Sequence, residues 1–367
     1  MLSVVIAGGG TGGHLYPGIA VARELLAQRP GTQVTFAGTA AGIEARVVPR
    51  EGFALDVIRS AGIKGKSVTG RLRGAVLLPL GAMDAWSLLS RRRPSAVVGV
   101  GGYSSGPVVA LAAARRIPTL LMEQNAVPGL TNRLLARVVD AAAVTYEESR
   151  AFFGDRAFMS GNPVRAEFFA GRPAGEGHED RHSPPAAVRV LVFGGSQGAH
   201  AINVAMVEAA ARLGPVEPRV AITHQTGERD LGMVRDGYRK AGMDARVEPF
   251  LFTMDQEMNA ADLVICRAGA TTLAELTAAG RPSILIPLPT ATDDHQRRNA
   301  LALVNNGAAR MVEQRELTGE RLASEVRTLV SDVGARRRMS LAARAMARPD
   351  AARVIVERIL ELVESRA

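Results

Sequence analysis

Cysteine is nearly absent from this sequence, and aromatic side chains are scarce. The chain has one cysteine, Cys266, which excludes a disulfide bond within it. Aromatic residues make up 4% of the chain. Proteins that bind single-stranded nucleic acid stack the bases on aromatic side chains beside a basic groove, so this composition disfavours a nucleic-acid partner.

Signals for export and for metal binding are also missing. The N-terminus lacks the basic segment and cleavage site of an export signal, so we expect a cytoplasmic protein. The sequence has no cluster of cysteine and histidine residues and no Asp-x-Asp pattern, and we therefore expect no metal ion and no cofactor. Asp293 and Asp294 are adjacent, which is more typical of a helix cap.

One uncharged stretch, from Ser95 to Ala114, has about the 20 residues of a membrane span. It contains GVGGYSSGP, in which clustered glycine, serine and proline indicate a buried strand, a tight loop and a helix start. Irregular backbone of this kind is not tolerated in contact with lipid. The sequence therefore disfavours a transmembrane segment here.

What the chain does have is positive charge and enough length for two cores. Lysine and arginine total 45 against 36 aspartate and glutamate residues, for a net charge of +9. Charge alone favours an anionic partner without choosing among nucleic acid, nucleotides, phosphorylated substrates and the inner leaflet of a membrane. A single hydrophobic core stops growing at roughly 250 to 300 residues, so 367 residues with 47% apolar composition predict two domains.

Apolar runs rich in β-branched residues alternate with glycine-rich turns and helical stretches along most of the chain. They include SVVIAGGG, QVTFAGT, AVVGVGG and PTLLMEQN, then VRVLVFGGSQG, RVAITHQTG, DLVICRAGA and PSILIPLP. Such strands are typical of parallel sheets covered on both faces by helices, so we predict the α/β class. The stretch from Ala170 to Val188, rich in proline, glycine and charge, interrupts the pattern as a linker or a surface loop.

An internal repeat supports two similar domains. Residues 8–14, GGGTGGH, align with residues 194–200, GGSQGAH, and each segment follows an apolar run and precedes a helical stretch. Two Rossmann-like domains are therefore predicted, with a ligand in the cleft between them, where strand ends and helix N-termini converge.

Gly8, Gly10 and Gly13 match the G-x-G-x-x-G spacing of dinucleotide-binding loops. In such a site an acidic residue at the end of the second strand holds the ribose hydroxyls. Here that strand, TQVTFAGTA, ends without aspartate or glutamate. The spacing therefore indicates only a backbone that approaches an anionic ligand closely, at a helix N-terminus that favours negative charge.

Seven motifs resemble the MurG family of glycosyltransferases, and they occur in the family's order over nearly the whole chain. The motifs are GGTGGHLYPGIA (9–20), VGVGGYSSGP (98–107), EQNAVPGLTNR (123–133), SGNPVR (160–165), GGSQGAHAIN (194–203), CRAGATTLAEL (266–276) and DHQRRNA (294–300). The resemblance implies a GT-B fold and an inverting transfer of GlcNAc from UDP-GlcNAc to the MurNAc 4-hydroxyl of lipid I, an undecaprenyl-linked acceptor. The product, lipid II, serves peptidoglycan synthesis, and through it cell-wall biogenesis, cell shape and cell division.

The resemblance also implies the roles of the domains. Residues 1–163 would form the acceptor and membrane-facing domain, and residues 164–340 the UDP-GlcNAc-binding domain, with a linker or loop near 170–188. Residues 341–367 would form a C-terminal helix that returns to the first domain. A UDP-sugar epimerase or a natural-product glycosyltransferase would share this fold and donor site, and stays open as an alternative.

On the donor side, the resemblance assigns the residues that would hold UDP-GlcNAc. Without a metal, the charge on the departing diphosphate must be met by backbone N–H groups, helix dipoles and a cation. Glu275 would hold the ribose, although a capping box with Thr272 is an alternative role. Arg165 could instead form a surface salt bridge, and Leu251 could be a core residue. The candidates for the diphosphate are Arg165, Ser196, Gln197, Ala270, Thr271 and Thr272. Leu251 is the candidate for the uracil, Glu275 for the ribose, and Gln296 and Asn299 for the sugar hydroxyls.

On the acceptor side, the first glycine loop resembles a diphosphate cradle, formed by Thr11, Gly12 and Gly13. His14 is the candidate general base, because an imidazole exchanges protons near neutral pH. A purely structural role for His14 is the alternative. Tyr103 and Asn125 would approach the substrate from the same domain, unless they only form loop hydrogen bonds; where family members carry histidine, this chain has Met122.

A basic and apolar stretch between the second and third predicted strands could touch the membrane. Its apolar candidates lie between Arg71 or Arg73 on one side and residues 91–93 on the other. This composition favours peripheral binding to the anionic inner leaflet, at the cytoplasmic face of the cell membrane. A buried Rossmann helix with solvated ends is an equal alternative. The candidate contacts are Val76, Leu77, Leu80 and Trp86.

Overall fold

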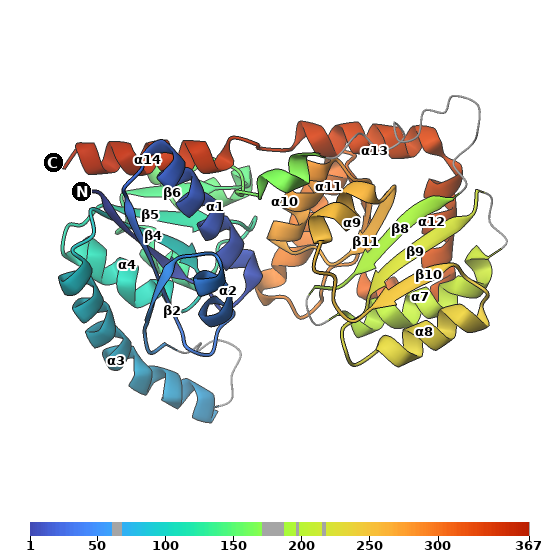
Figure 1. Cartoon of the computed structure of the whole chain (residues 1–367), viewed down its shortest axis with the longest axis horizontal. Helices are drawn as coiled ribbons and strands as arrows, with labels where there is room; N and C mark the ends of the chain where they lie inside the picture. The colour runs from blue at the N-terminus through green and yellow to red at the C-terminus, as the bar shows by residue number, and fades with distance from the viewer. Residues whose placement is uncertain (61–67, 171–186, 196–197, 215–217, 367) are drawn as a thin grey trace. The chain divides into compact units, whose positions relative to one another are not determined.

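The computed structural model describes residues 1–60, 68–170, 187–195, 198–214 and 218–366, with the backbone path alone at 68–78. The chain divides into two compact units. The first comprises Met1–Val164 together with Arg348–Ala367, and the second comprises Arg165–Ala347. Each unit is built on its own parallel sheet (Figure 1).

The first unit contains a seven-stranded parallel sheet in the order β3-β2-β1-β4-β5-β6-β7. Helices follow most of its strands, as crossover connections between parallel strands require. The strands are β1 (Ser3–Gly8), β2 (Gln33–Gly38), β3 (Ala54–Val57), β4 (Ala96–Gly101), β5 (Thr119–Glu123), β6 (Ala141–Val144) and β7 (Ala157–Met159). The helices are α1 (Gly12–Gln28), α2 (Glu44–Arg50), α3 (Val68–Arg92), α4 (Ser105–Ala114), α5 (Leu130–Leu135), α6 (Glu147–Arg150), the short 3₁₀ helix η1 (Gly154–Arg156) and α14 (Ala351–Glu364).

Strand β1 illustrates why the central strands of this unit are apolar throughout. Val4 and Ile6 belong to a core that α1 and α14 cover. Val5 and Ala7, which point the other way, belong to a second core that α3 and α4 cover. The terminal helix α14 packs beside α1 on the first of these faces (Figure 1). Both faces of the strand are therefore buried, which removes the alternation seen in half-exposed sheets.

The second unit contains a six-stranded parallel sheet in the order β10-β9-β8-β11-β12-β13. A core of this unit lies where α7, α8 and α12 cover the sheet. The strands are β8 (Val188–Phe193), β9 (Val220–Gln225), β10 (Ala245–Glu248), β11 (Leu263–Cys266), β12 (Ser283–Leu285) and β13 (Ala309–Met311). The helices are η2 (Ala166–Ala170), α7 (His200–Leu213), α8 (Leu231–Lys240), α9 (Met254–Ala260), α10 (Ala270–Ala279), η3 (Thr292–Asp294), α11 (His295–Asn305), η4 (Gln314–Glu316), α12 (Gly319–Ser331) and α13 (Val333–Ala345).

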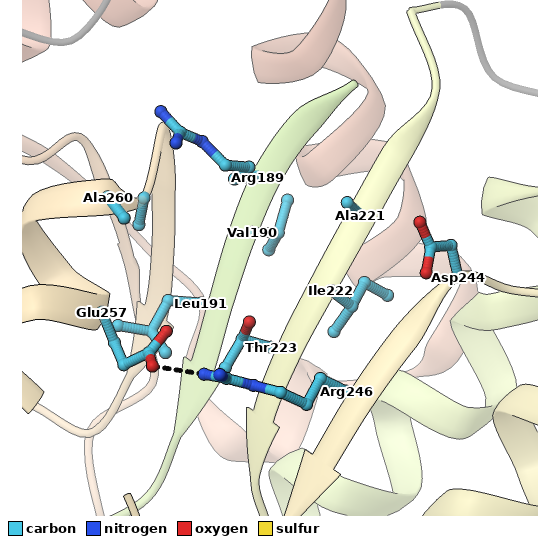
Figure 2. Close-up of a pocket in the computed structure, with 11 residues that line it drawn as sticks. Arg189, Val190, Leu191, Ala221, Ile222, Thr223, Asp244, Arg246, Glu257 and Ala260 are labelled. Carbon is cyan, nitrogen blue, oxygen red and sulfur yellow. Dashed lines mark ion pairs between the residues drawn. The ribbon is translucent and has the colours of Figure 1, made fainter. Parts of the chain in front are cut away.

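A cavity of about 300 Å³ lies against β8, β9, β10 and α9 in the second unit (Figure 2). Its charged lining residues are largely neutralised within the protein. Arg246 forms an ion pair with Glu257, and Arg189 lies 3.4 Å from a carboxylate oxygen of Asp262. Since both cations already have carboxylate partners, the cavity shows no clear preference for a charged ligand.

The strand orders place one topological switch point in each sheet. The order reverses between β1 and β4 in the first unit and between β8 and β11 in the second. In open α/β sheets, ligands bind outside the carboxyl ends of the strands at such points. The loops that leave these four strands are therefore the first places to look for a site.

The C-terminal segment differs from its sequence-based prediction. The sequence places boundaries after residues 163 and 340, whereas the chain divides after Val164 and after Ala347. The single helix expected over 341–367 is corrected to two: α13 ends at Ala345 in the second unit, and α14 begins at Ala351 in the first. Pro349 separates them because it lacks an N–H group and disfavours helical backbone at the preceding residue.

Two other expectations concern single segments. The uncharged stretch 95–114 forms β4, a loop and α4, as its glycine and serine residues predict. Among the helices in the described part of the chain, none is long and apolar enough to cross a membrane. Most of the predicted linker at 170–188 lies outside the described residues.

Candidate active site

The glycine loops at the switch point of the first unit touch each other through their backbones. The Gly9 N–H donates to the Gly101 carbonyl oxygen at 3.4 Å. A Cβ atom on Gly102 would lie 2.5 Å from the Gly9 carbonyl oxygen, and one on Gly8 would lie 2.4 Å from the Gly101 carbonyl oxygen. Side chains are excluded here by contact, which explains why both loops consist of glycine.

Glu44, at the start of α2, reaches back to the first glycine loop. Its side chain is fully buried, and its carboxylate accepts hydrogen bonds from Gly10 N at 2.8 Å and from Thr39 N and Oγ1 at 2.8 and 2.9 Å. Burial raises the pKa of this carboxyl group, but these hydrogen bonds outweigh burial and hold its pKa below the ordinary value. An acidic residue therefore follows the second strand after all, and it binds the loop itself.

The hydrogen bond from Gly10 to Glu44 limits which backbone groups of the first glycine loop can bind a diphosphate. A diphosphate cannot use the Gly10 N–H while Glu44 accepts from it, and two negative groups at this loop would repel each other. The predicted cradle residues Thr11, Gly12 and Gly13 lie at the N-terminus of α1, with Thr11 exposed at the N-cap position. The cradle proposal is thus restricted to this helix terminus.

His14 lies in the first turn of α1, beside the loop that follows β4. A Cβ atom on Gly101 would lie 2.8 Å from His14 Nδ1, so the imidazole ring packs directly on this backbone. His14 Nδ1 is 3.3 Å from Oε1 of Gln124. The ring is half-buried, as a group that exchanges a proton with a ligand must be at least partly accessible.

Asn125 is held by the buried carboxylate of Glu123 at the end of β5. Asn125 donates to Glu123 Oε1 from its backbone N at 3.0 Å and from Nδ2 at 3.2 Å. Gly129 N and Asn132 Nδ2 donate to the other carboxylate oxygen at 3.1 and 2.9 Å. Burial raises the pKa of Glu123, and the four hydrogen bonds offset this only in part. The loop hydrogen bonding expected as an alternative for Asn125 is therefore present.

Tyr103 and Met122 differ in exposure. Tyr103 is 48% exposed, and its carbonyl oxygen accepts a hydrogen bond from Ser60 Oγ at 3.0 Å. Its ring is thus accessible to a ligand. Met122, where the family carries histidine, is buried in β5 and belongs to the core beneath α1. A polar contact from this position is replaced by apolar packing.

In the second unit, Gln225 connects the second glycine loop to the segment that follows β10. Gln225 is buried at the end of β9, where Nε2 donates to the Gly195 carbonyl oxygen and Oε1 accepts from Leu251 N, both at 2.8 Å. Gly198 also packs tightly, since a Cβ atom there would lie 1.8 Å from the Thr226 carbonyl oxygen. Ser196 and Gln197, which the sequence assigns to the diphosphate, lie outside the described residues.

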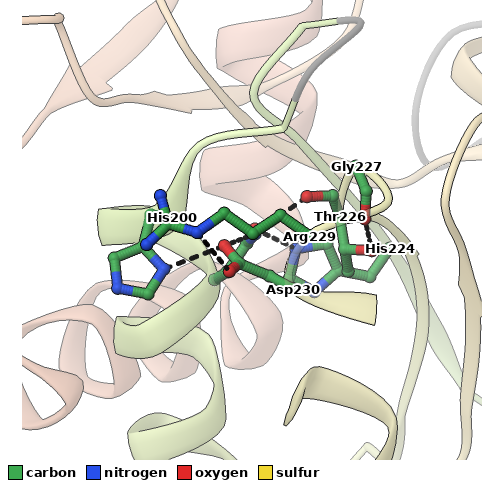
Figure 3. A network of polar contacts seen from close by, with 7 residues as sticks. His200, His224, Thr226, Gly227, Arg229 and Asp230 are labelled. Atoms are coloured by element: carbon green, nitrogen blue, oxygen red, sulfur yellow. Dashed lines mark hydrogen bonds and ion pairs between the residues drawn. The ribbon is translucent and has the colours of Figure 1, made fainter. Parts of the chain in front are cut away.

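A chain of hydrogen bonds lies behind this loop, and Figure 3 shows its part at His200 and Asp230. Tyr238 donates its hydroxyl proton to His224 Nδ1 at 2.8 Å, and His224 Nε2 donates to Asn203 Oδ1 at 3.0 Å. Burial lowers the pKa of His224 to about 3, so this imidazole is neutral. Asn203 Nδ2 and His200 Nδ1 both lie 2.9 Å from Asp230 Oδ2. The chain ties the start of α7 to the loop before α8 and is structural in character.

Glu275 and Arg165 interact within the second unit. Burial raises the pKa of Glu275 to about 7, although the positive charge of Arg165 opposes the shift and Asp255 adds to it. The Arg165 guanidinium also lies 5.1 Å from the ring centroid of Phe168. A carboxyl group that is poised near neutrality beside an arginine is a strong candidate for ligand binding.

The alternative capping role of Glu275 is wrong. Helix α10 begins at Ala270, and its N-cap is Gly269 rather than Thr272. Thr271 and Thr272 are half-buried in the first turn, where they can line a ligand. Of the two aspartates expected at a helix cap, Asp294 occupies the N-cap position of α11, where its side chain makes no capping hydrogen bond.

The remaining donor candidates differ in accessibility. Leu251 is 7% exposed, so its side chain belongs to the core, whereas the neighbouring Phe252 is 91% exposed and makes an edge-on contact with Phe250. Gln296 is half-buried, and its Oε1 accepts from Leu288 N at 3.0 Å. Asn299 is fully buried, which argues against a direct contact with a sugar hydroxyl.

Helix α3 has a buried and an exposed side at its C-terminal end. Leu88 and Leu89 are buried in the core, whereas Met83 is 63% and Trp86 56% exposed. The Arg115 guanidinium lies 5.0 Å from the Trp86 ring centroid. Leu80 is half-buried. The side chains of the other two candidate contacts, Val76 and Leu77, lie outside the described part.

Basic residues at the end of α3 are partly neutralised. Arg91 and Arg92 lie 3.0 and 2.8 Å from the carboxylate of Asp56. Burial raises the pKa of Asp56, but the hydrogen bonds and charges of the two arginines lower it more. These arginines therefore contribute less net charge to a surface than the sequence indicates.

In the residues that the structure describes, no group of three or more His, Cys, Asp or Glu side chains could hold a metal ion.

Family models match both units. The glycosyltransferase family 28 N-terminal domain matches residues 4–144, and the glycosyltransferase family 28 C-terminal domain matches residues 189–355. The chain belongs to glycosyltransferase family 28. It is an enzyme of the glycosyltransferase class, and its two parallel-sheet units are the Rossmann-like domains of the GT-B fold.

Relatives of this glycosyltransferase match it along its length. A UDP-N-acetylglucosamine--N-acetylmuramyl-(pentapeptide) pyrophosphoryl-undecaprenol N-acetylglucosamine transferase from Anaeromyxobacter sp. (strain K) is 48% identical, over 100% of this chain and 94% of the relative. A protein of the same name from Pelobacter propionicus is 50% identical, over 98% of this chain and 99% of the relative. The crystal structure of Acinetobacter baumannii MurG has a TM-score of 0.79 at 30% identity, covering 98% of this chain and 100% of that one.

A more distant match shows only the fold. UDP-GlcNAc 2-epimerase from Neisseria meningitidis, solved with UDP-GlcNAc, has a TM-score of 0.69 at 13% identity, over 98% of this glycosyltransferase and 100% of that chain. The dehydrogenase interpretation is disfavoured by the family and by Glu44, which binds the loop that would receive a dinucleotide.

Sequence reasoning missed the buried residues that hold the glycosyltransferase site in place. Glu44, Glu123 and Gln225 bind backbone groups of candidate loops, and each follows or ends a strand. For Glu123 and Gln225, the position at the end of an apolar run was the available signal, whereas Glu44 lies beyond the loop that follows β2. Arg267, in the motif CRAGATTLAEL, donates to the carbonyl oxygens of Ile286 and Pro287 at 3.0 and 3.1 Å, so it supports a loop.

Proposed function

We propose that this enzyme transfers GlcNAc from UDP-GlcNAc to the 4-hydroxyl of MurNAc in lipid I, with inversion at the anomeric carbon, to form lipid II. The observation that carries the proposal is the match of about half of all residues, over essentially the full chain, to relatives that bear this activity in their names. The fold alone would also fit an epimerase, whereas relatives with this identity and coverage carry the transferase activity in their names.

On the donor side, the second unit supplies groups suited to UDP-GlcNAc. An ionised Glu275 accepts hydrogen bonds from the ribose hydroxyls, and Arg165 balances the charge of the diphosphate. Ala270, Thr271 and Thr272 begin α10 at the carboxyl end of β11, where the helix terminus favours the same negative charge. Stabilisation of the departing UDP by these groups lowers the barrier to sugar transfer.

The uracil and the GlcNAc of the donor contact other residues of the second unit. The uracil lies against the segment at Leu251, whose backbone Gln225 holds, and the exposed ring of Phe252 offers an additional apolar surface. Gln296 keeps its amide nitrogen for a sugar hydroxyl, because its oxygen accepts from Leu288 N.

On the acceptor side, His14 is the general base. It removes the proton of the MurNAc 4-hydroxyl as the oxygen attacks the anomeric carbon, and UDP departs with the electron pair of the broken bond. Tyr103 and Asn125 orient the acceptor sugar. Thr11, Gly12 and Gly13 receive the acceptor diphosphate at the N-terminus of α1.

Lipid I is anchored by its undecaprenyl chain, so the enzyme works as a peripheral protein at the cytoplasmic face of the membrane. The exposed end of α3, with Met83 and Trp86, is the surface we assign to this contact. An exposed tryptophan next to cationic side chains suits the interface of an anionic leaflet.

The deciding experiment is incubation of the full chain with UDP-GlcNAc and a lipid I analogue. We expect UDP release that requires the acceptor and yields the disaccharide with inverted anomeric configuration. UDP release or sugar epimerisation that proceeds equally without the acceptor would contradict the proposal and favour an epimerase.

A further inference from the structure

Gln124 occupies a buried position between β4 and the candidate base. It follows β5 directly and is 2% exposed. Its Nε2 donates a hydrogen bond to the Val100 carbonyl oxygen at 3.2 Å, and its Oε1 lies 3.3 Å from Nδ1 of His14. The side-chain amide thus links a fixed backbone carbonyl group to the imidazole ring.

The chemistry of these three groups determines where the protons lie. A backbone carbonyl oxygen can only accept a hydrogen bond, so the amide nitrogen of Gln124 must face Val100. The amide oxygen then faces His14 Nδ1, and it can also only accept. Nδ1 must therefore carry the hydrogen, and in a neutral imidazole this leaves the lone pair on Nε2.

The surroundings prevent Gln124 from reversing. Rotation of the amide would place its oxygen against the Val100 carbonyl oxygen and leave buried polar groups unsatisfied, which costs about 1–3 kcal/mol for each group. The preceding residue, Glu123, is held by four hydrogen bonds, so the backbone at this point is firmly placed. The contact between Gly101 and the His14 ring limits movement of the imidazole.

We propose that Gln124 is a positioning residue that selects the Nδ1-protonated tautomer of His14 and so makes Nε2 the proton acceptor. This inference rests on the proposed function for its catalytic consequence. When the acceptor hydroxyl attacks, its O–H bond breaks and the proton moves to Nε2, while the Nδ1–H stays on Gln124 Oε1. The resulting imidazolium has a hydrogen-bond acceptor at Nδ1 throughout the step.

The tautomer can be observed without any activity. Nitrogen-15 NMR of the full chain, labelled at its six histidines, resolves protonated from unprotonated ring nitrogens at a pH where the imidazoles are neutral. A His14→Gln sample identifies the signals of His14. We expect Nδ1–H in the wild type and a shift toward Nε2–H, the form that histidine favours in water, in Gln124→Met. Nε2–H in the wild type, or an unchanged tautomer in Gln124→Met, would overturn the proposal.

Kinetics test the consequence for catalysis. Gln124→Met should lower kcat by about 10- to 100-fold, less than the roughly 100- to 10,000-fold that loss of the general base itself costs, with KM for UDP-GlcNAc unchanged. Gln124→Glu restores an acceptor at Nδ1 and should recover part of the rate, with the acid limb of the pH profile moved to higher pH because a carboxylate favours imidazolium. Gln28→Met, at the other end of α1, is the matched control and should change neither readout.

The outcomes separate this inference from the proposed function. A switched tautomer with full turnover in Gln124→Met would overturn the catalytic role of the selected nitrogen. Absence of acceptor-dependent transfer by the wild type would contradict the proposed function, while the NMR result would still decide whether Gln124 selects the tautomer.

Discussion

Glu44 and Glu275, the carboxyl groups near the two switch points, have opposite pKa shifts, because hydrogen bonds outweigh desolvation at Glu44 and desolvation dominates at Glu275. Glu44 receives hydrogen bonds from Gly10 and Thr39, which lower its pKa despite burial. Among the described residues no hydrogen-bond donor lowers the pKa of Glu275, and burial raises this pKa to about 7. One group is therefore ionised under all physiological conditions, whereas the other responds to pH and to ligands.

Glu44→Gln should destabilise the first unit at neutral pH. The new amide would place an N–H₂ group toward the N–H donors of Gly10 or Thr39, at a cost of about 1–3 kcal/mol. Since the folded pKa lies below 4.5, the wild-type contribution is fully present above that pH and is lost as pH falls through the folded value. Urea denaturation at pH 7 and at low pH should show the difference between the proteins shrinking on acidification.

Glu147→Gln is the control for this change. Glu147 is exposed and paired with Arg150 within one helical turn, so its loss should cost less than about 0.5 kcal/mol at any pH. Equal stability of Glu44→Gln and the wild type at pH 7 would show that the buried carboxylate does not support the glycine loop.

UDP-GlcNAc affinity should depend on the protonation of Glu275. The ionised form accepts from ribose hydroxyls, and a pKa of about 7 means that it is scarce at pH 6 and dominant at pH 8. Binding should therefore be about tenfold weaker at pH 6 than at pH 8, with proton release on binding near pH 6.5. Calorimetry measures both, and UDP-GlcNAc has no phosphate group that titrates in this range.

Glu275→Gln separates this carboxyl group from other titrating groups. The variant should bind UDP-GlcNAc more weakly at pH 8 and should lose the pH dependence, since the amide does not ionise. A pH dependence that persists in the variant would assign it to another group.

At the scale of elements, α3 combines a core face with an exposed apolar end. The double change Met83→Ser with Trp86→Ser removes the two most exposed apolar side chains described on this helix. We expect weaker sedimentation with anionic vesicles, and the binding that remains should fall by a larger fraction at high salt, because charge interactions are screened within about 8 Å at physiological ionic strength. Leu341→Ser, at an equally exposed position on α13, is the matched control. Unchanged vesicle binding in the double variant would remove this surface from the membrane contact.

Helix α14 is an integral part of the first unit's core. Ile355 and Ile359 are buried in the cluster that covers β1 and β4. Ile359→Ala should lower the free energy of unfolding by about 2–5 kcal/mol, whereas Leu341→Ala on the exposed face of α13 should cost far less. Urea denaturation checks both. A small effect at Ile359 would mean that α14 is only loosely attached.

At the scale of the whole molecule, the fold is compatible with more than one reaction, and sequence identity to named relatives indicates which reaction this enzyme catalyses. Glycosyltransferases and epimerases share the two parallel sheets, so the architecture alone does not select a reaction. The full-length identity to named transferases does select one. The excess of positive charge is consistent with two anionic substrates and an anionic leaflet.

Donor binding should not need a divalent ion. The donor candidates are an arginine, hydroxyl groups and a helix N-terminus, and the described residues contain no group of acidic, histidine or cysteine side chains that could hold a metal. Calorimetry with UDP-GlcNAc should give the same affinity, within about twofold, in a chelator and in millimolar magnesium. A loss of binding in the chelator would show that an ion shares the diphosphate.

The amino-acid sequence by itself determined the fold class, the repeat and the position of both glycine loops. These features depend on neighbouring residues: apolar runs form buried strands, and glycine permits the tight turns that follow them. The family motifs could be recognised for the same reason, since each is a short local pattern.

The tertiary structure decided which polar groups already have hydrogen-bond partners, which side chains are buried and which carboxyl groups have shifted pKa values. Glu44 lies 34 residues from Gly10, and Gln124 lies 110 residues from His14, so no local pattern shows that these pairs meet. The separation of α13 from α14 and the burial of Asn299 likewise follow from packing between distant segments. Hydrogen bonding and desolvation act at contact distance, and the fold alone brings these partners together.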